Sequence, residues 1–379
     1  MKTQKRLGDY IREVDVRNRD LSVTTLLGVS ISKEFIPSIA NTIGTDMSTY
    51  KIVCKGQFAY GPVTSRNGDK VSIALLANED NAIISQAYTV FEVKDANELL
   101  PEYLMMWFRR PEFDRYARFH SHGSAREVFD WSEMCDVSLP IPSIEQQREI
   151  VSEYETISKR IKLNEQIIKN LEATAQTLYH KMFVEGIDKE NLPEGWIIGT
   201  IAEFCKDMKS GGTPSRNNNL YWNKKEYRWL KSGEVHNNII IDVEEHISKK
   251  GLDNSSAKII PAGTITMAMY GATAAQVAYV DCETTTNQAC CNMICHTKND
   301  AAYLFFHLLA IQEDVKKLAN GGAQENLSQE LIAQQPIIII NDIEQKSIFV
   351  PILDNLIVLY KENLKLTELQ SLLLAKMGQ

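Results

Sequence analysis

The cysteine-rich stretch near residue 290 holds the residue types best suited to binding a metal. Cys282, Cys290, Cys291, Cys295 and His296 lie close together in the chain, and thiolates with imidazole are common ligands of zinc. The stretch lacks paired C-x-x-C motifs, and neighbours such as Cys290 and Cys291 would face opposite sides of a strand. These spacings favour free thiols in a β-rich core over a zinc site. The odd total of 7 cysteines also argues against a secreted disulfide framework.

Two further patterns contain residues that could perform acid–base or nuclease chemistry. His120 and His122 flank Ser121, and Glu92-Val93-Lys94 is a Glu-x-Lys triplet. The histidines have no evident acidic partner in the sequence, and the triplet lacks the further carboxylates that would hold a metal. Phosphate-binding loops of the G-x-x-x-x-G-K-[ST] and G-x-G-x-x-G types and the H-E-x-x-H zinc motif do not occur. The sequence therefore predicts a non-catalytic chain that binds no metal or cofactor.

Polar residues on glycine-supported loops are better suited to contact than to reaction. Ser, Thr, Asn, Gln and Arg side chains can hydrogen-bond base edges and phosphates, and glycine lets backbone N–H groups approach a phosphate. Such loops are also ordinary surface turns in many proteins. The candidate DNA-contacting residues are Arg66, Asn67, Lys70, Ser121, His122, Ser124, Arg126, Thr213, Ser215, Arg216, Asn217, Lys224, Lys225, Gln324 and Asn326.

Composition offers no direct support for a nucleic-acid partner. The net charge of the 379 residues is -8, and neither 1–143, at -2, nor 187–335, at -4, is basic. Any basic surface must therefore arise when scattered lysines and arginines fold onto one face. The start of the chain has no apolar signal segment, and apolar runs such as Ile337–Ile340 are far shorter than the ~20 residues of a membrane span. We expect a cytoplasmic protein.

The elements that must position these residues repeat along the chain. Ile144-Glu145-Gln146-Gln147 and Ile343-Glu344-Gln345-Lys346 lie 199 residues apart, and each opens a heptad-patterned segment. This offset is too long for a solenoid repeat of ~20–50 residues. The repeat predicts two copies of a mixed α/β module, each followed by its own helix. We expect module 1 over 1–143, helix 1 over 144–186, module 2 over 187–335 and helix 2 over 336–379.

Local patterns predict elements inside the modules. Turn residues and β-prone runs indicate strands at 51–54, 57–60, 71–76 and 88–93 and a helix at 101–110 in the first module. In the second module they indicate strands at 227–231, 264–269, 276–280 and 289–296 and a helix at 301–318. The fold class expected from these elements is α+β.

The two long helices carry apolar residues at alternating steps of four and three. This spacing indicates a coiled-coil seam, and the stretch 150–182 would form a rod of roughly 50 Å. Asn164 and Asn363 occupy matching seam positions, so antiparallel pairing would bring them together; alternatively, each asparagine faces solvent or a bulky neighbour. The proposed seam contains Ile150, Tyr154, Ile157, Ile161, Asn164, Ile168, Leu171, Leu178, Phe349, Leu353, Leu356, Tyr360, Asn363, Leu366 and Leu373.

The ordered set of short motifs resembles the DNA specificity subunit of type I restriction–modification systems. The likeness covers essentially the whole chain. The motifs that carry it are Phe58-Ala59-Tyr60-Gly61-Pro62, Ile84-Ser85-Gln86-Ala87-Tyr88, Gly123-Ser124-Ala125-Arg126 and Leu139-Pro140-Ile141-Pro142 before the first helix, then Leu192-Pro193-Glu194-Gly195-Trp196, Gly211-Gly212-Thr213-Pro214-Ser215, Tyr221-Trp222 and Asn326-Leu327-Ser328 before the second.

The resemblance implies a function and a set of partners. The modules would be target recognition domains that each read half of a bipartite double-stranded DNA sequence. The helices would pack antiparallel, set the gap between the half-sites and dock two methyltransferase subunits. Those subunits would bind S-adenosylmethionine, and restriction subunits using ATP and Mg²⁺ could join them. The alternative from a different class is a coiled-coil scaffold whose two modules bind protein and never DNA.

Overall fold

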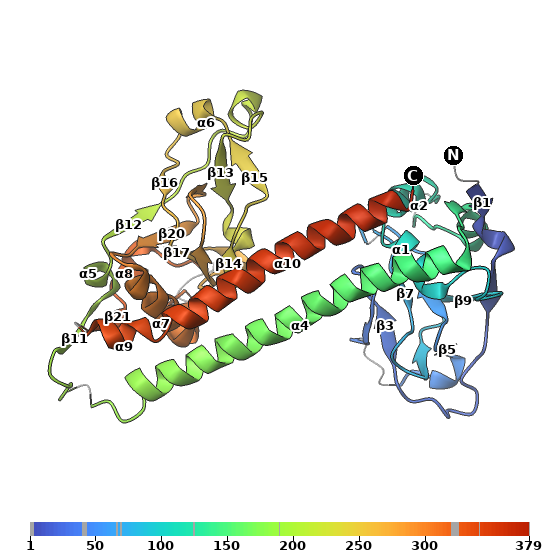
Figure 1. Cartoon of the computed structure of the whole chain (residues 1–379), viewed down its shortest axis with the longest axis horizontal. Helices are drawn as coiled ribbons and strands as arrows, with labels where there is room; N and C mark the ends of the chain where they lie inside the picture. Colours follow the sequence, from blue (N-terminus) through green and yellow to red (C-terminus); the bar gives the residue numbers. More distant parts are fainter. Residues whose placement is uncertain are drawn as a thin grey trace. The chain divides into compact units, whose positions relative to one another are not determined.

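The computed structural model describes residues 4–39, 44–65, 67–68, 70–123, 126–188, 190–319, 326–340 and 342–378. The chain divides into two compact units, one of Met1–Ile161 with Leu366–Gln379 and one of Lys162–Lys365. Each unit holds one globular module together with part of each long helix (Figure 1). Among the described helices, none combines the length and the apolar character that crossing a membrane would require.

The first module is mainly antiparallel β structure with short helices. Its strands are β1 (Gln4–Arg6), β2 (Ile11–Val14), β3 (Leu27–Val29), β4 (Phe35–Pro37), β5 (Lys51–Cys54), β6 (Phe58–Tyr60), β7 (Ile73–Leu75), β8 (Asn81–Ile84), β9 (Thr89–Val93) and β10 (Ser138–Pro140). Its helices are η1 (Leu7–Asp9), η2 (Met47–Thr49), α1 (Pro101–Phe108), α2 (Pro111–Phe119) and α3 (Trp131–Asp136). The predicted strands are confirmed as β5, β6, β7 and β9, and the predicted helix as α1.

The main sheet of this module has the strand order β2-β9-β6-β7 and is covered on both faces. Phe58 and Phe91 stack on one face with ring centroids 4.8 Å apart, and Phe108 of α1 packs edge-on against both. Ala59 and Val90 belong to a separate core cluster. Because successive side chains point to opposite faces, the two cores share the same strands.

The second module is larger and contains a five-stranded sheet, a four-stranded sheet and the two-stranded pair β11-β21. Its strands are β11 (Trp196–Thr200), β12 (Asp207–Ser210), β13 (Tyr227–Leu230), β14 (Asn238–Ile240), β15 (Glu245–Ile247), β16 (Ile259–Ile260), β17 (Thr264–Ala268), β18 (Val277–Val280), β19 (Thr284–Thr286), β20 (Cys290–Ile294) and β21 (Pro336–Ile340). Its helices are α5 (Ile201–Phe204), η3 (Asn219–Tyr221), η4 (Ser232–Glu234), α6 (Lys249–Asp253), η5 (Gly271–Thr273), α7 (Lys298–Leu318) and α8 (Gln329–Ala333). The predicted strands are confirmed as β13, β17, β18 and β20, and the predicted helix as α7.

The two modules share a topology, as the repeat predicted. The order β2-β9-β6-β7 recurs as β12-β20-β17-β18 within the sheet β12-β20-β17-β18-β14, and every pair in these two runs is antiparallel. The pair β1-β10 that joins the start and the end of the first module recurs as β11-β21. A buried tyrosine donates to the closing strand in both, Tyr103 to the Pro140 carbonyl at 3.0 Å and Tyr303 to the Ile338 carbonyl at 2.9 Å. The modules differ in their remaining strands, which form the pairs β3-β4 and β5-β8 in the first module and the sheet β15-β13-β19-β16 with the edge strand β14 in the second.

The repeated Ile-Glu-Gln segment ties each helical segment to its own module. Gln147 is fully buried, accepts the Leu100 N–H at 2.9 Å and donates to the Glu98 carbonyl at 2.9 Å. At the equivalent position, Lys346 Nζ contacts Asp300 Oδ1 at 2.6 Å. Leu100 precedes α1, and Asp300 lies in the first turn of α7. In each module, therefore, the same position of the repeat contacts the start of the equivalent helix.

The long helices are α4 (Ile144–Phe183) and α10 (Val350–Lys376), which pair antiparallel within each unit. In the first unit, Gln370 Nε2 donates to Ser158 Oγ at 2.7 Å. In the second, Ala175 and Tyr179 share a core with Phe349 and other residues near the start of α10. Every residue assigned to the seam is buried or half-buried.

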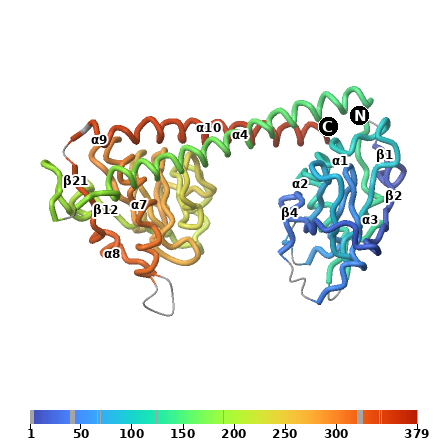
Figure 2. The backbone as a smooth tube through the Cα atoms, turned by 90° about the horizontal axis from the view of Figure 1, so that it is seen from below, coloured from blue at the N-terminus to red at the C-terminus, as the bar shows by residue number. Residues whose placement is uncertain are grey.

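The second helical segment is not the single rod that the sequence indicated from Ile343 onward. It consists of α9 (Ile343–Ser347), which packs on α7, and then α10 (Figure 2). Pro351 lies in the first turn of α10, where its missing N–H needs no helical partner. The same residue is unfavourable inside a helix, so a continuous run through it from α9 is disfavoured.

The polar pair expected in the seam is present. Asn164 is fully buried, and its Nδ2 donates to Asn363 Oδ1 at 2.8 Å and to Glu362 Oε2 at 3.0 Å. The predicted approach of the two asparagines is therefore confirmed. Because these groups meet in one register only, the pair opposes sliding of α4 along α10.

Replacing Asn164 with leucine should lower the free energy of unfolding by about 1–3 kcal/mol, because it removes the donor shared by Asn363 and Glu362. The double variant Asn164→Leu/Asn363→Leu should regain much of this loss, since apolar side chains then replace both amides. Denaturant unfolding of the three proteins measures both differences. A double variant less stable than the single one would contradict this account of the pair.

A buried tyrosine–histidine contact joins α4 to α7 in the second unit. Tyr179 Oη lies 2.6 Å from His307 Nδ1, and both side chains are buried. Burial lowers the pKa of His307 to about 4, and the Pro336 carbonyl opposes this effect only in part. The imidazole is therefore neutral at neutral pH.

The second module should accordingly lose stability in acid. The folded-state pKa of His307 is about 4, below its ordinary value of 6.5, so its contribution is complete above pH 6.5 and is lost as the pH falls toward 4. The pKa difference corresponds to about 3 kcal/mol. Urea unfolding between pH 7 and pH 4 should show this slope, and His307→Gln should flatten it. His122→Gln, at an exposed ring in the first module, should retain the slope; equal slopes in wild type and His307→Gln would refute the assignment.

Candidate nucleic-acid interface

Polar loops gather at one end of the main sheet in each module, which we call the loop end. It is the end at which β6 stops and β9 starts in the first module, where Tyr60 pairs with Thr89. In the second module β17 stops and β20 starts there, and Ala268 pairs with Cys290. In both modules, the loop after β6 or β17 is bridged to the segment that follows α2 or α7. The shared topology thus presents equivalent loops twice.

The structure brings together the two candidate loops of the first module. Thr64 Oγ1 donates to Ser121 Oγ at 3.0 Å, and the Thr64 N–H donates to the Glu127 carbonyl at 3.0 Å. Val63 and His122 each form a β-bridge with Val128. These contacts place the two loops, which lie far apart in sequence, on one surface.

The remaining candidates of this module fall on the same two loops. Asn67 is half-buried, with its Nδ2 3.4 Å from the Val63 carbonyl, whereas Lys70, His122 and Arg126 are exposed. Within the described ranges, Lys70 and Arg126 form no ion pair, so both cations are available to an external anion. Arg66 and Ser124 lie outside the described residues.

The histidines beside this loop have an acidic neighbour that the sequence did not reveal. His120 Nδ1 lies 2.9 Å from Glu133 Oε2, and His122 Nε2 lies 3.9 Å from Glu133 Oε1. Glu133 belongs to α3 and meets them only through the fold. In the part of the chain that the structure describes, no three His, Cys, Asp or Glu side chains gather closely enough to hold a metal.

The cysteine-rich stretch lies largely in the core of the second module. Cys290 and Cys291 are fully buried in β20, and Cys282 is half-buried. Burial raises the pKa of Cys282 to about 11 and that of Cys291 to about 12. These thiols are therefore protonated at neutral pH.

Two indoles anchor the candidate loop that follows β12. Trp229 Nε1 donates to the Gly212 carbonyl at 2.9 Å, and Trp222 Nε1 donates to the Ser215 carbonyl at 3.2 Å. The Arg216 guanidinium lies over the Trp222 ring, 3.7 Å from its centroid, and also pairs with Glu245. This pairing holds the pKa of Glu245 below its usual range. In this structure Arg216 therefore fastens the loop to the module.

A close backbone approach fixes the first residue of the same loop. A Cβ atom on Gly211 would lie 2.1 Å from the Thr286 carbonyl oxygen and 2.4 Å from the Asn287 carbonyl oxygen. The next N–H, of Gly212, donates to the Thr286 carbonyl at 2.8 Å. Only glycine allows this approach. Past the glycines, Thr213 Oγ1 donates to Gln288 Oε1, while Asn217 is exposed.

The last candidate loop of this module is only partly described. Asn326 forms a β-bridge with Tyr270, and the Leu327 N–H donates to the Met269 carbonyl at 2.8 Å. These contacts place Asn326 at the loop end. Gln324 lies outside the described residues.

One stretch of the second module is basic, although the net charge of the whole module is negative and conceals this. Residues 206–258 carry 10 basic and 7 acidic side chains, although 187–335 is acidic as a whole. The arginines of this segment are engaged, Arg216 with Glu245 and Arg228 with Asp242. Several lysines, in contrast, are exposed and form no ion pair within the described residues: Lys206, Lys224, Lys225, Lys250 and Lys258.

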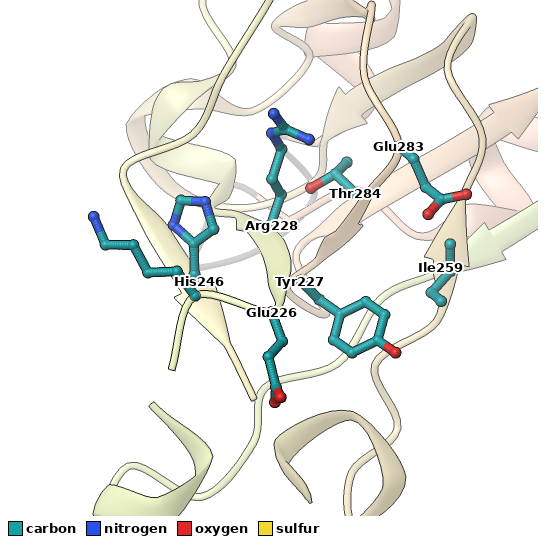
Figure 3. A pocket seen from close by; sticks show the side chains of 8 residues that line it. Glu226, Tyr227, Arg228, His246, Ile259, Glu283 and Thr284 are labelled. Carbon is teal, nitrogen blue, oxygen red and sulfur yellow. The ribbon is translucent and has the colours of Figure 1, made fainter. Parts of the chain in front are cut away.

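Lys225 lines a small pocket away from the loop end. The pocket of about 250 Å³ lies near the start of β13 and β19 (Figure 3). The loop end, in contrast, follows the last residues of these two strands. Its lining mixes cations with carboxylates, so its charge does not select one kind of ligand. The lining residues are Lys225, Glu226, Tyr227, Arg228, His246, Ile259, Glu283 and Thr284.

Several known proteins are similar to this chain. The family described as Type I restriction modification DNA specificity domain matches residues 37–173 and 193–371. The HindI specificity subunit of Haemophilus influenzae is 24% identical over 407 residues, covering 86% of each chain. The EcoR124I/EcoR124II specificity subunit of Escherichia coli is 25% identical over 171 residues, covering 44% of this chain and 41% of the other. The S subunit of a type I restriction–modification system from M. genitalium shares the fold, with a TM-score of 0.61 and 14% identity over 100% of this chain and 96% of the other.

Proposed function

This chain belongs to the type I restriction modification DNA specificity family, and we propose that each of its modules reads one half of a bipartite DNA sequence. The chain is the DNA specificity subunit of a type I restriction–modification system. The proposal that each module recognises one half-site rests on the duplicated sheet order, β2-β9-β6-β7 and β12-β20-β17-β18. Each copy presents equivalent loops at its loop end, and the surrounding loops differ in sequence, as readers of different half-sites would.

The helices α4 and α10 would set the gap between the half-sites and dock the partner subunits. The Asn164–Asn363 contact supports a fixed register, which a spacer requires. α10 also exposes large apolar side chains, which a partner could cover. These are Val358, Leu364, Leu369 and Leu372.

The partner subunits would supply the chemistry. The family places this chain in a complex with other restriction–modification subunits, which we take to be two methyltransferase subunits and restriction subunits. S-adenosylmethionine, ATP and Mg²⁺ would be held by those partners, and this chain would catalyse no step itself. The assembly would act on DNA in the cytoplasm.

Charge supports a shared DNA interface. The chain carries a net charge of -8, so phosphate repulsion opposes binding by this subunit alone. Exposed lysines of residues 206–258, with Lys70 and Arg126, offer cations for phosphate. We expect weak DNA binding by the isolated chain and sequence-specific binding once methyltransferase subunits contribute further positive charge.

Two measurements test the proposed function. Duplex binding as a function of salt, with and without methyltransferase subunits, should show steep salt dependence and selectivity only in the complex. Methylome sequencing of cells that express the chain with its methyltransferase should reveal a single bipartite motif. A chain with no affinity for DNA in either state would instead be a protein-binding scaffold.

A further inference from the structure

The two modules contain the same glutamine-bearing turn at the loop end, at an offset different from the 199 residues of the helix repeat. Ser85-Gln86-Ala87-Tyr88 leads into β9, and Asn287-Gln288-Ala289-Cys290 leads into β20. In the first, the Tyr88 N–H donates to the Ser85 carbonyl at 3.0 Å. In the second, the Cys290 N–H donates to the Asn287 carbonyl at 3.3 Å. Gln86 and Gln288 thus occupy the same position of the same turn.

Side-chain contacts reinforce the equivalence. The Ala87 N–H donates to Ser85 Oγ at 3.4 Å, and the Ala289 N–H donates to Asn287 Oδ1 at 3.2 Å. In each turn, the residue before the glutamine therefore satisfies the backbone N–H after it, as serine and asparagine commonly do. Gln86 and Gln288 are both exposed. Their own side chains are not needed to hold the turn.

Buried hydrogen bonds also order the turn that contains Gln288. Asn292 is almost fully buried, accepts from Thr266 Oγ1 at 2.8 Å and donates to Thr286 Oγ1 at 2.8 Å. Thr286 directly precedes the turn, and Gly211 packs against its carbonyl. A buried, fully paired network of this kind orders the backbone that presents Gln288.

The contacts of Gln288 restrict what it can recognise. Its Oε1 accepts from Thr213 Oγ1, so the amide presents its Nε2 hydrogens outward as donors. Bidentate reading of adenine requires the amide oxygen and nitrogen together. Thr213 occupies one of the two acceptor positions of Oε1, whereas both Nε2 hydrogens remain for an acceptor. The phosphate oxygen is the acceptor that every DNA sequence offers.

We propose that Gln86 and Gln288 donate equivalent hydrogen bonds to a backbone phosphate, one in each half-site, and thereby set the register of each module on the duplex. This inference rests on the proposed function. The surrounding loops differ between the modules, whereas this side chain and its turn are the same. A contact common to two different half-sites fits the backbone, which is common to both.

The test measures binding of the complex with its methyltransferase subunits to cognate and unrelated duplexes. Gln288→Ala and Gln86→Ala should each weaken binding to both duplexes by the same factor, about threefold to tenfold, which is the effect of one neutral hydrogen bond. The double variant should show about the product of the two factors, because the sites are independent. Gln288→Lys should tighten binding at low salt and steepen the slope of log affinity against log salt by about 1.

A matched control is Gln334, which is exposed in the same module near α5 and the start of β12, the opposite end of the sheet. Gln334→Ala and Gln334→Lys should leave both affinities and the salt slope unchanged. Selectivity lost at one base pair in Gln288→Ala would show base reading and overturn the proposal, as would unchanged affinity in both alanine variants. If the wild-type complex itself fails to discriminate the duplexes, the proposed function falls, and this inference with it.

Discussion

Replacing Gly211 with alanine should disable the second module while the first retains its function. The added Cβ would lie 2.1 Å from the Thr286 carbonyl oxygen and 2.4 Å from that of Asn287. Both are backbone atoms, so the loop after β12 and the turn before β20 must move apart, at a cost of about 3 kcal/mol. The substitution destabilises the loop conformation that binds DNA by this amount, so we expect the affinity for the cognate duplex to drop about hundredfold. Methylation of the bipartite site should fall accordingly.

The same module provides a matched control. A Cβ on Gly233 would meet no atom within 4 Å, and Gly233 does not have a positive φ. Gly233→Ala should therefore bind and methylate like the wild type. Thermal unfolding of the two variants shows whether the damage extends beyond the loop. If the Gly211→Ala variant methylates DNA as well as the wild type does, the close approach of Gly211 to the Thr286 carbonyl has no role in presenting the loop end.

Lengthening the paired helices should change the spacing of the target and leave its half-sites intact. Four residues would be inserted into α4 before Asn164 and four into α10 after Asn363, so that the asparagine pair and both module junctions keep their contacts. The insertion extends a helix by about 6 Å, close to two base pairs at about 3.4 Å each. We expect methylation of the original site to disappear and a site with a longer gap to replace it.

Methylome sequencing gives both the half-sites and the gap in one measurement. A control in which four exposed residues of α4 are replaced without changing its length should methylate the original site. An unchanged gap in the lengthened variant, or altered half-site sequences, would be inconsistent with a spacer role for α4 and α10.

The elements that the sequence predicted correctly are those encoded by local periodicity. The seam of α4 and α10 follows from apolar steps of three and four, and the Asn164–Asn363 contact follows from two matching positions in antiparallel helices. The break between α9 and α10 was missed even though Pro351 is visible in the sequence. The predicted seam starts only at Phe349, so its periodicity does not cover the break, and one helix from Ile343 was expected because Ile343 repeats Ile144 at the start of α4.

The candidate interface was predicted less completely, because its members meet through loops. Ser121 was a candidate, but its contact with Thr64 depends on the pairing of distant segments. Arg216 was a candidate for DNA contact, and in the structure it stacks on Trp222 and pairs with Glu245. Such engagement depends on neighbours that are remote in sequence. The equivalence of Gln86 and Gln288 was hidden because the intervening loops differ in length between the modules.

The sequence by itself determined that the chain holds two α+β modules and two long helices, because repeats and heptads are properties of residue order. Only the tertiary structure decided which side chains face outward at the loop ends, which cations are exposed and which turns are equivalent. Those properties depend on distances between residues far apart in the chain, and the folded backbone alone sets them.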